Sequence, residues 1–478
     1  MVALGKFGVE TVRDWEPELG PVVCWHPSPA TLEKAREAPI SPVPASYQQA
    51  GHIRGYRDHA ARGLDWSRLL IATFDVTGKC DIRAMTYVIN AHLRRHDTYR
   101  SWFEYQDKDH AVRRTIPDPA DIELVPVEHG EMTWAELRDH ALSTPNPLQW
   151  GCFRFGCIQA ADHFTLYICI DHVYVDAMSV GMVFLEIYLT YVALVEGEAP
   201  IALPEAGSYA DYSVRQHQYT SALTLESPPV RKWVEFAENN GGTLPDSPVP
   251  LGDPSVACDS DLMGVRLMDA SQTEQFESVC TAAGARFSGG VFACAAFAEY
   301  ELTGAETYYG LTPNDTRSAP MDFLTAGWFT GLVPITVPVG ATTFAAAARA
   351  AQASFDTGKE LANVPFDRVL ELAPWLSGPR GRYSVLSYHD AGLPPFSGLI
   401  SSQLDGLNAR IYHDGRVPSQ LNTRVNRLAD ETQLTVVFPK NPVARESVTK
   451  YVAALKSVYA RVAEGTAAVS PLRRDARV

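Results

Sequence analysis

Apolar residues in the first part of the chain follow the periods of strands and helices in turn. Leu69–Val76 is an almost continuous apolar run of strand length, and Ile82–Arg95 places its apolar residues near a helical period. Trp102–Tyr105 and Ala111–Ile116 are short runs that can pair as a hairpin. Before them, Pro27–Pro44 is rich in proline and small residues, which predicts an irregular arm.

Two further strand-like runs lead to a polar hexapeptide. Cys152–Gln159 and Phe164–Ile170 are separated by a tight connection, and alternate residues of the second run point to opposite faces. The hexapeptide Asp171–Asp176 follows directly, and an apolar helix begins near Met178. Its apolar part, Met182–Val195, is shorter than the roughly 18 residues of a membrane span, so the pattern predicts a buried helix and no integral membrane segment.

The chain changes character in residues 197–254, where proline and glycine cluster, and we interpret this stretch as a connection between two halves. After it, the pattern predicts strands at Gly264–Met268, Tyr308–Thr312 and Val333–Val339, helices at Ser271–Ala283, Gly290–Tyr300 and Val443–Val462, and a meander of Ile411–His413, Ser419–Arg427 and Gln433–Phe438. Ser271, with Glu274 three residues on, is the expected N-cap of the first helix. The mixture of elements predicts an α/β fold of the α+β type rather than a doubly wound sheet.

Composition and charge are those of an ordinary globular protein and exclude some classes of partner. The 478 residues are 46% hydrophobic and 20% charged, with a formal net charge of -15. No basic patch stands out, so nucleic acid is not an expected partner. The start of the chain, Met1–Glu18, has no basic and apolar leader, so we expect a cytoplasmic protein, with peripheral contact at the inner membrane as an option.

Eight cysteines do not make a disulfide framework in a chain of this length. Cys152, Cys157 and Cys169 lie close in sequence but lack CxxC spacing. We therefore expect buried core thiols, with no metal and no cofactor.

The hexapeptide carries the strongest chemical signal in the sequence. His172 is followed four positions later by Asp176, on a strand-to-helix connection. A neutral imidazole, with an unperturbed pKa near ~6.5, can take the proton of an acceptor hydroxyl, and a positioned general base accelerates such a step by roughly 10²–10⁴. Taken alone, an HxxxD pattern is weak because short patterns recur by chance.

Three further segments strengthen that signal, and together the four resemble the condensation domains of the chloramphenicol-acetyltransferase superfamily. Ser46–Gln49 resembles the SxxQ element of that family, Arg95–Arg100 its RHExLR element, and Gly327–Pro334 its GxFxNxxP element, with Gly331 in place of asparagine. Arg317 lies ten residues before Gly327, where the family has an arginine. These elements occur in the family's order and cover nearly the whole chain.

The resemblance narrows to the mycobacterial polyketide-associated acyltransferases that form trehalose esters, on the segments Gly327–Pro334, 94–105 and 366–376. It implies two chloramphenicol-acetyltransferase-like subdomains in a V, with the active-site tunnel between them. The expected division is residues 1–196 for the first subdomain, 197–254 for the connection, 255–465 for the second subdomain and 466–478 for a disordered tail.

The resemblance also implies roles for individual residues. His172 corresponds to the general base of the HHxxxDG motif, Asp176 to its structural aspartate, and Arg317 to the salt-bridge partner of that aspartate in the other half. Two positions depart from the motif: Asp171 replaces its first histidine, and Ala177 its final glycine. These departures weaken a peptide-forming activity more than an acyl transfer.

Several other residues could belong to the active site or have a structural role. Gly327 and Trp328 are candidates for the substrate channel, although Trp328 could equally pack in the core. His96 is expected to be structural, as a cation at a helix C-terminus. His389 could face the site or have a plain hydrogen-bond partner, and the Asp414–Gly415 pair is expected to form a hairpin turn.

The resemblance implies an O-acyltransferase that moves a long-chain acyl group from a thioester to a hydroxyl of trehalose or a trehalose glycolipid. The donor would be acyl-CoA, or an acyl group on a carrier protein or polyketide synthase, used as a substrate. Two alternatives remain: esterification of another alcohol, such as a polyketide diol or a wax alcohol, and a catalytically silent condensation-like binding module.

Overall fold

The computed structural model describes residues 9–107, 111–197, 201–340, 342–379, 383–390, 392, 407–416, 420–428 and 430–465. By its internal contacts the chain divides into two units. The first comprises Met1–Ser221, Arg317–Phe329 and Gly398–Gly415, and the second comprises Ala222–Thr316, Thr330–Ser397 and Arg416–Val478. The predicted disordered tail, 466–478, lies outside the described residues.

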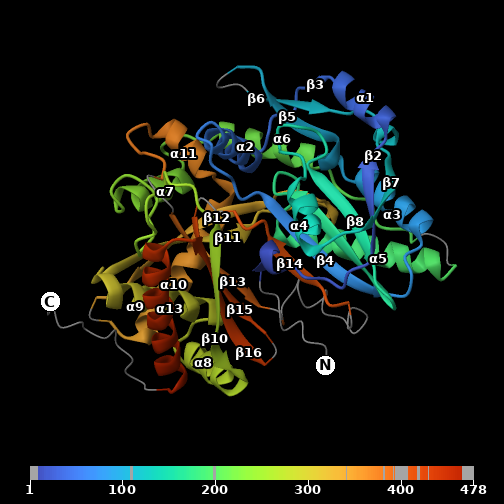
Figure 1. The fold of residues 1–478 in the computed structure, drawn as a ribbon. Coiled ribbons are helices and arrows are strands. Elements are labelled where there is room, and N and C mark those ends of the chain that lie inside the picture. The colour runs from blue at the N-terminus through green and yellow to red at the C-terminus, as the bar shows by residue number, and fades with distance from the viewer. Residues whose placement is uncertain are drawn as a thin grey trace. The chain divides into compact units, whose positions relative to one another are not determined.

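A seven-stranded mixed sheet of the order β1-β14-β4-β9-β8-β2-β7 forms the centre of the first unit (Figure 1). Its strands are β1 (Val9–Thr11), β2 (Pro21–Pro27), β4 (Leu69–Thr77), β7 (Leu124–Glu131), β8 (Phe153–Gln159), β9 (His163–Asp171) and β14 (Arg410–His413). β9 pairs antiparallel with β4 on one side and with β8 on the other. Both faces of β9 are buried, so its alternate residues pack against two different layers.

Helices cover both faces of this sheet. α3 (Ile82–Arg95) and α5 (Ala177–Val195) pack together on the face to which Phe74 of β4 contributes. α4 (Trp134–Leu142) packs on the other face, to which Ile71 of the same strand contributes. The alternation of a strand therefore assigns neighbouring residues to two separate cores.

Smaller elements complete the first unit. A second sheet has the order β3-β6-β5 and contains β3 (Ile40–Ser41), β5 (Ser101–Tyr105) and β6 (Ala111–Thr115). The remaining helices are α1 (Pro29–Glu37), α2 (Tyr47–Ala60), α6 (Tyr209–Ser221) and the short turns η1 (Val12–Asp14), η2 (Asp97–Arg100), η3 (Pro119–Asp121) and η4 (Pro320–Leu324).

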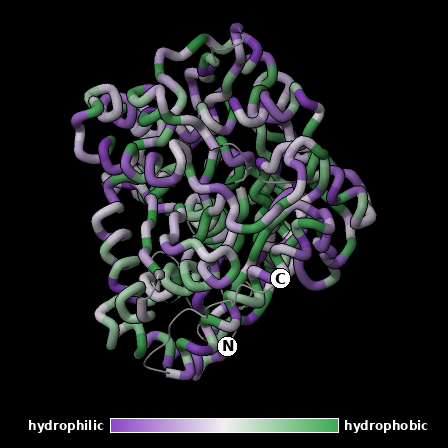
Figure 2. Tube along the Cα trace, turned by 90° about the vertical axis from the view of Figure 1, so that its left-hand side faces the viewer, coloured by the Kyte–Doolittle hydropathy of each residue, from purple (hydrophilic) through white to green (hydrophobic). Residues whose placement is uncertain are grey.

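The second unit is built on a six-stranded sheet of the order β10-β16-β15-β13-β11-β12. Its strands are β10 (Ser260–Asp269), β11 (Thr307–Asp315), β12 (Thr330–Pro338), β13 (Tyr383–Asp390), β15 (Gln420–Arg427) and β16 (Glu431–Pro439). One face shares a core with α8 (Ala270–Ala282), α9 (Phe287–Thr303), α10 (Phe344–Gly358) and α13 (Pro442–Ala463). The other packs against α7 (Pro228–Glu238), η5 (Lys359–Asn363) and α11 (Phe366–Leu372). In Figure 2 hydrophobic segments gather toward the inside of the trace, and many of the outlying turns are hydrophilic.

Most predicted elements are present, and α3 begins and ends where the pattern placed it. The predicted meander is wrong in one strand, because β14 lies in the sheet of the first unit while β15 and β16 pair in the second. The predicted arm is wrong as well: it contains α1, capped by the side chain of Ser28 with a proline at the first position. The N-cap of α8 is Asp269, at the end of β10, rather than Ser271.

The apolar part of the helix after the hexapeptide is longer than predicted. α5 has 19 residues, Ala177–Val195, and its apolar window of 18 residues includes positions before Met182, so the prediction that this part is too short to span is wrong. Among the described residues it is long and apolar enough to cross a membrane, and 39% of its apolar window is buried in the structure. A core helix of a folded domain can meet the same criteria.

Candidate active site

Local structure fixes the backbone of the hexapeptide at both ends. Asp171 is the last residue of β9, and the N–H of His172 donates to the carbonyl of Arg68 at 2.7 Å. Asp176 is the N-cap of α5, and its carboxylate accepts a hydrogen bond from the N–H of Ser179 at 2.8 Å. The strand end and the helix cap together hold His172 in one backbone position.

The His172 ring lies directly against an aromatic side chain. Its centroid is 3.8 Å from that of Trp328, with 35° between the ring planes. Nδ1 is buried and makes no hydrogen bond to another described residue, whereas the residue as a whole is partly exposed. Nδ1 is therefore not the part of His172 that is exposed.

Burial decides the protonation state of His172. It lowers the pKa of the imidazole to about 4, and the nearby His52 acts in the same direction. The carboxylates of Asp176 and Asp171 act in the opposite direction but do not offset the burial. At neutral pH the ring is therefore neutral, and one of its nitrogens has a free lone pair.

Asp171, at the motif position where the family has a histidine, is the anchor of a buried charge network. Its side chain is fully buried and accepts from Nε2 of His52 at 2.8 Å and from the guanidinium of Arg68 at 2.9 Å. Burial alone would raise the pKa of Asp171, but His52 and Arg68 bring it below its usual value. The indole of Trp66 donates to Nδ1 of His52 at 3.4 Å, which leaves the ring proton on Nε2, facing the carboxylate.

Asp176 is paired with the arginine that the sequence indicated. Nη1 and Nη2 of Arg317 each lie 3.1 Å from a carboxylate oxygen of Asp176, and both side chains are almost completely buried. Burial alone would raise the pKa of Asp176, but the charge and hydrogen bonds of Arg317 bring it below its usual value. The carboxyl group therefore stays ionised. Arg317 belongs to the first unit, so the pair lies within one unit and not across two halves as expected.

The segment around Gly327 is attached to the beginning of α5. The carbonyl of Gly327 accepts from the N–H of Asp176 at 3.0 Å and from the hydroxyl of Ser179 at 2.8 Å. A Cβ at Gly327 would lie 2.2 Å from the ring of Tyr209, so no side chain fits there. These contacts carry Trp328 onto His172, which makes Trp328 part of the candidate site.

The remaining motifs support the hexapeptide from outside. The side-chain amide of Gln49 donates to the carbonyl of Val173 at 3.0 Å, and Ser46 forms the capping box of α2 with Gln49. His96 is structural, but burial lowers its pKa to about 4, so the expectation of a cation at the helix end is wrong. Nδ1 of His96 accepts a hydrogen bond from the N–H of Ala326, and Nε2 contacts the carboxylate of Glu186.

Three other predictions made from the sequence can be compared with the described residues. His389 is on β13 of the second unit and contacts the side chain of Asn426 at 3.1 Å. Asp414 and Gly415 do not form a hairpin turn, because β14 and β15 lie in different sheets. The buried carboxylate of Asp414 instead accepts the N–H groups of Arg68 and Leu69 and caps the start of β4. The expectation of buried thiols is confirmed for Cys152, Cys157 and Cys169, and burial raises the pKa of Cys169 to about 12.

Sequence reasoning missed His52 and Arg68. His52 carried a signal, because Ser46, Gln49 and His52 recur at intervals of three and share a face of α2. Arg68 carried none, since its role follows from the pairing of β4 with β9. Two groups of possible metal ligands lie among the described residues, and neither includes His172.

A mixed α/β fold of two units, with a histidine at the end of a strand and a buried aspartate–arginine pair at the start of the following helix, is the arrangement that the resemblance to condensation domains implies. Residues 69–375, more than half of the chain, match the family model described as the condensation domain. The chain therefore belongs to the condensation-domain family and, within it, to the PapA acyltransferases, on the similarity of the relatives that follow.

Trehalose-2-sulfate acyltransferase PapA2 of Mycobacterium bovis is 58% identical over 97% of this chain and 99% of its own length. The 2'-acyl-2-O-sulfo-trehalose (hydroxy)phthioceranyltransferase PapA1 of Mycobacterium tuberculosis is 55% identical over 99% of this chain and 93% of its own length. A solved structure titled PapA2 acyl transferase superposes with a TM-score of 0.92 at 58% identity, covering 96% of this chain and 100% of that one. The predicted family and its chloramphenicol-acetyltransferase-like fold are confirmed.

Proposed function

We propose that this acyltransferase moves a long-chain acyl group from a thioester to a hydroxyl of trehalose or of a trehalose glycolipid, with His172 as the general base. The observation that carries the proposal is a neutral His172 at the end of β9, partly exposed as a residue, whose Nδ1 is buried. The acceptor is supported by the names of relatives that are 55% and 58% identical and act on sulfated trehalose.

The chemistry needs one base and no covalent enzyme intermediate. Nε2 of His172 takes the proton of the acceptor hydroxyl as its oxygen attacks the thioester carbonyl carbon. The tetrahedral intermediate then collapses, the carbon–sulfur bond breaks, and the leaving sulfur takes the proton held by His172. Atoms and charge balance, and the acyl thioester is the only other reactant; no cofactor takes part.

Asp176, Arg317 and Asp171 act as positioning residues in this proposal. Asp176 and Arg317 fix the first turn of α5 and the segment that carries Trp328. Asp171 holds the strand end through the N–H of Val173 and through Arg68. None of them needs to exchange a proton with substrate.

The donor is proposed to be acyl-CoA or an acyl group carried by a polyketide synthase, both of which present the same thioester. We also propose that the protein works in the cytoplasm and reaches its lipid product by peripheral contact with the inner membrane. Cosedimentation with anionic and neutral vesicles, with and without the acylated product, tests this location.

The decisive assay incubates the protein with palmitoyl-CoA and one of three acceptors: trehalose, trehalose-2-sulfate or a long-chain alcohol. Release of free thiol that depends on a sugar, with a sugar ester seen by mass spectrometry and no acylated protein, supports the proposal. An ester of the long-chain alcohol alone would move the protein to another branch of the family. Absence of all three esters, with no difference between wild type and His172→Ala, would indicate a silent binding module.

A further inference from the structure

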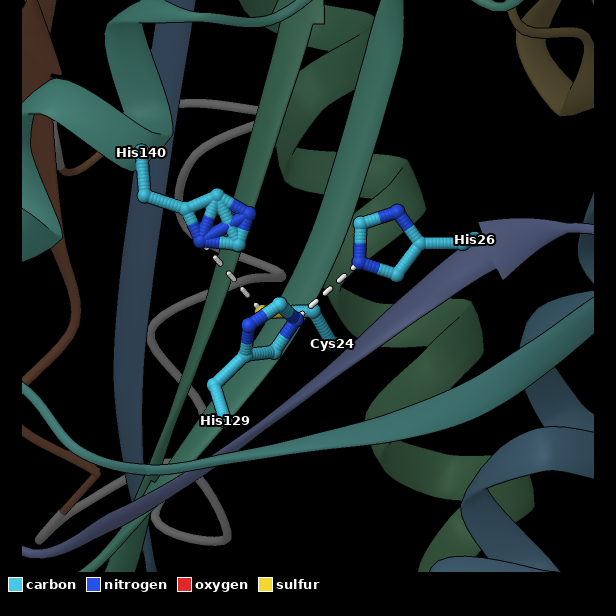
Figure 3. A group of neighbouring side chains, drawn as sticks. All are labelled: Cys24, His26, His129 and His140. Carbon is cyan, nitrogen blue, oxygen red and sulfur yellow. Dashed lines mark hydrogen bonds between the residues drawn. The ribbon is translucent and has the colours of Figure 1, made fainter.

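Four side chains from three separate segments of the sequence converge at one edge of the first unit. Cys24 and His26 lie on β2, His129 on β7 and His140 on α4 (Figure 3). We call this group the Cys24 cluster. β2, β7 and α4 carry none of the candidate active-site residues, so the cluster needs an explanation of its own.

The local structure explains why these side chains meet. Cys24 and His26 are two positions apart on a strand and therefore share a face. His129 is the extra residue of a β-bulge, because Val22 pairs with Gly130 and Val23 pairs with Glu128. A bulge re-aims a side chain, and here the His129 ring points to the same centre as the others (Figure 3).

Two of the separations between the ligand atoms are close to those of a tetrahedral metal site. One donor atom from each residue lies within 4.8 Å of all the others. Sγ of Cys24 is 3.6 Å from Nδ1 of His140, and the Nε2 atoms of His26 and His129 are 3.2 Å apart. Ligands at the zinc distances of about 2.0–2.3 Å, in tetrahedral geometry, are separated by about 3.3–3.8 Å.

The chemistry of the donors favours a borderline metal ion. Three imidazoles and one thiol offer the nitrogen and sulfur donors that zinc takes. The Tyr167 hydroxyl lies 2.9 Å from Sγ of Cys24 and can donate to it. A coordinating thiol loses its proton to the metal outright.

Arg154 is the side chain that opposes coordination. Its guanidinium donates to Nε2 of His140, which requires the ring proton to sit on Nδ1, facing Cys24. Coordination through Nδ1 therefore requires the ring to change tautomer and Arg154 to release Nε2. The ion and Arg154 thus compete for His140, and this competition can be measured.

The other group of possible ligands, His92, His96 and Glu186, lacks these features. Nδ1 of His92 and Nε2 of His96 each contact an oxygen of Glu186, at 3.0 and 3.2 Å. Nε2 of His92 lies 3.2 Å from the hydroxyl of Tyr99, and Nδ1 of His96 receives the N–H of Ala326. Every ring nitrogen of that group has a partner other than a metal, so the group is a hydrogen-bond network.

We propose that the Cys24 cluster binds one zinc ion through one thiolate and three imidazoles. Four protein ligands fill a tetrahedral shell, which is the arrangement of structural rather than catalytic zinc. The ion would join the edge strand β7 and the helix α4 to β2. His129 is exposed and gives the ion a path to the cluster.

The test measures metal on the full-length protein. Wild type, His129→Ala and the control His163→Ala are stripped with a chelator and titrated with Zn²⁺, with bound metal measured by mass spectrometry. Wild type and His163→Ala should bind one equivalent and melt at a higher temperature with zinc. His129→Ala should bind at least about 100-fold more weakly, beyond the cost of losing an outer-shell partner.

Cobalt and Arg154 make the test specific. Co²⁺ in the wild type should give the intense visible bands of a tetrahedral site and a thiolate charge-transfer band, which Cys24→Ser removes. Arg154→Gln should bind zinc more tightly than the wild type, because the competing cation is gone. Equal zinc binding by wild type and His129→Ala, or an octahedral cobalt spectrum in the wild type, would overturn the proposal. None of these readouts depends on acyl transfer.

Discussion

Two buried carboxylates stand on either side of His172, and they are held in different ways. Asp171 takes its partners Arg68 and His52 from the N-terminal part of the chain, where β4 and α2 lie. Asp176 takes Arg317, 141 positions further along the chain. The first network fixes the end of a strand, while the second also brings a distant segment, with Trp328, to the histidine.

The two carboxylates of one motif are therefore held by two different kinds of ion-pair network. The Asp176 pair is the one that the family motif preserves. The Asp171 network replaces a histidine that the family usually has, and it does so with a full buried ion pair. Each network can be broken separately, and the histidine between them can be removed while both remain.

The largest effect is expected from His172→Ala. This change removes the proposed base and leaves both carboxylate networks intact, so turnover should fall by at least ~10² while the melting temperature stays near that of the wild type. Thiol release with palmitoyl-CoA and trehalose measures the rate, and circular dichroism checks the fold. A folded variant with nearly normal turnover would refute the mechanism.

Arg317→Ala is expected to have the next largest effect. It leaves the buried carboxylate of Asp176 uncompensated, which lowers the free energy of unfolding by about 3–5 kcal/mol. Urea denaturation measures the loss. The control is Arg138→Ala, which breaks a more exposed pair with Glu16 and should cost less than about 1 kcal/mol. Equal losses in the two variants would show that the Asp176 pair adds little.

Asp171 can be changed toward the family motif, and this should harm the protein. Asp171→His leaves the buried Arg68 without its carboxylate and should cost about 3–5 kcal/mol. Asp171→Asn also removes the charge but keeps an oxygen that can accept a hydrogen bond from Arg68 or His52, so it should cost less than Asp171→His. Thermal or urea unfolding ranks the two variants. If Asp171→His is as stable as the wild type, the ion pair with Arg68 is not what this position requires.

The pH dependence follows from the lowered pKa values. The folded pKa of His172 is about 4, below its unfolded value of about 6.5, so the acidic limb of kcat/KM should lie near pH 4. Asp171 and Asp176 also have lowered pKa values. The two ionised carboxylates therefore stabilise the folded state fully above the unfolded pKa of about 3.9. This stabilisation is lost as the pH falls from there through their lower folded pKa values. An acidic limb near 6.5 would contradict the burial of His172.

The smallest effect is expected from the cysteines near the hexapeptide. Direct transfer makes Cys157 a spectator, so Cys157→Ala should leave the rate within a few-fold of the wild type. Mass spectrometry of the protein during turnover should detect no acylated cysteine. A cysteine that is acylated and deacylated at the rate of turnover would replace direct transfer with a covalent mechanism.

Local pattern predicted the elements around the site well. α3 was predicted with its observed bounds, and the strand, hexapeptide and helix were predicted in order, because each depends on periodicity and on caps within a few residues. The errors arose where two local solutions compete or where a partner is distant. Asp269 and Ser271 both begin a capping pattern, and only the end of β10 decides between them. β14 has a strand pattern, but its sheet is set by β1 and β4.

The sequence by itself determined the hexapeptide, the order of the family motifs and the identity of Asp176 and Arg317, since these depend on residue type and spacing along the chain. Only the tertiary structure decided that Asp171 pairs with Arg68 and His52, that Trp328 packs against His172, and that Cys24, His26, His129 and His140 meet. These contacts depend on strand order, a β-bulge and helix packing. Such features join residues that are dozens or hundreds of positions apart, and no spacing in the sequence records them.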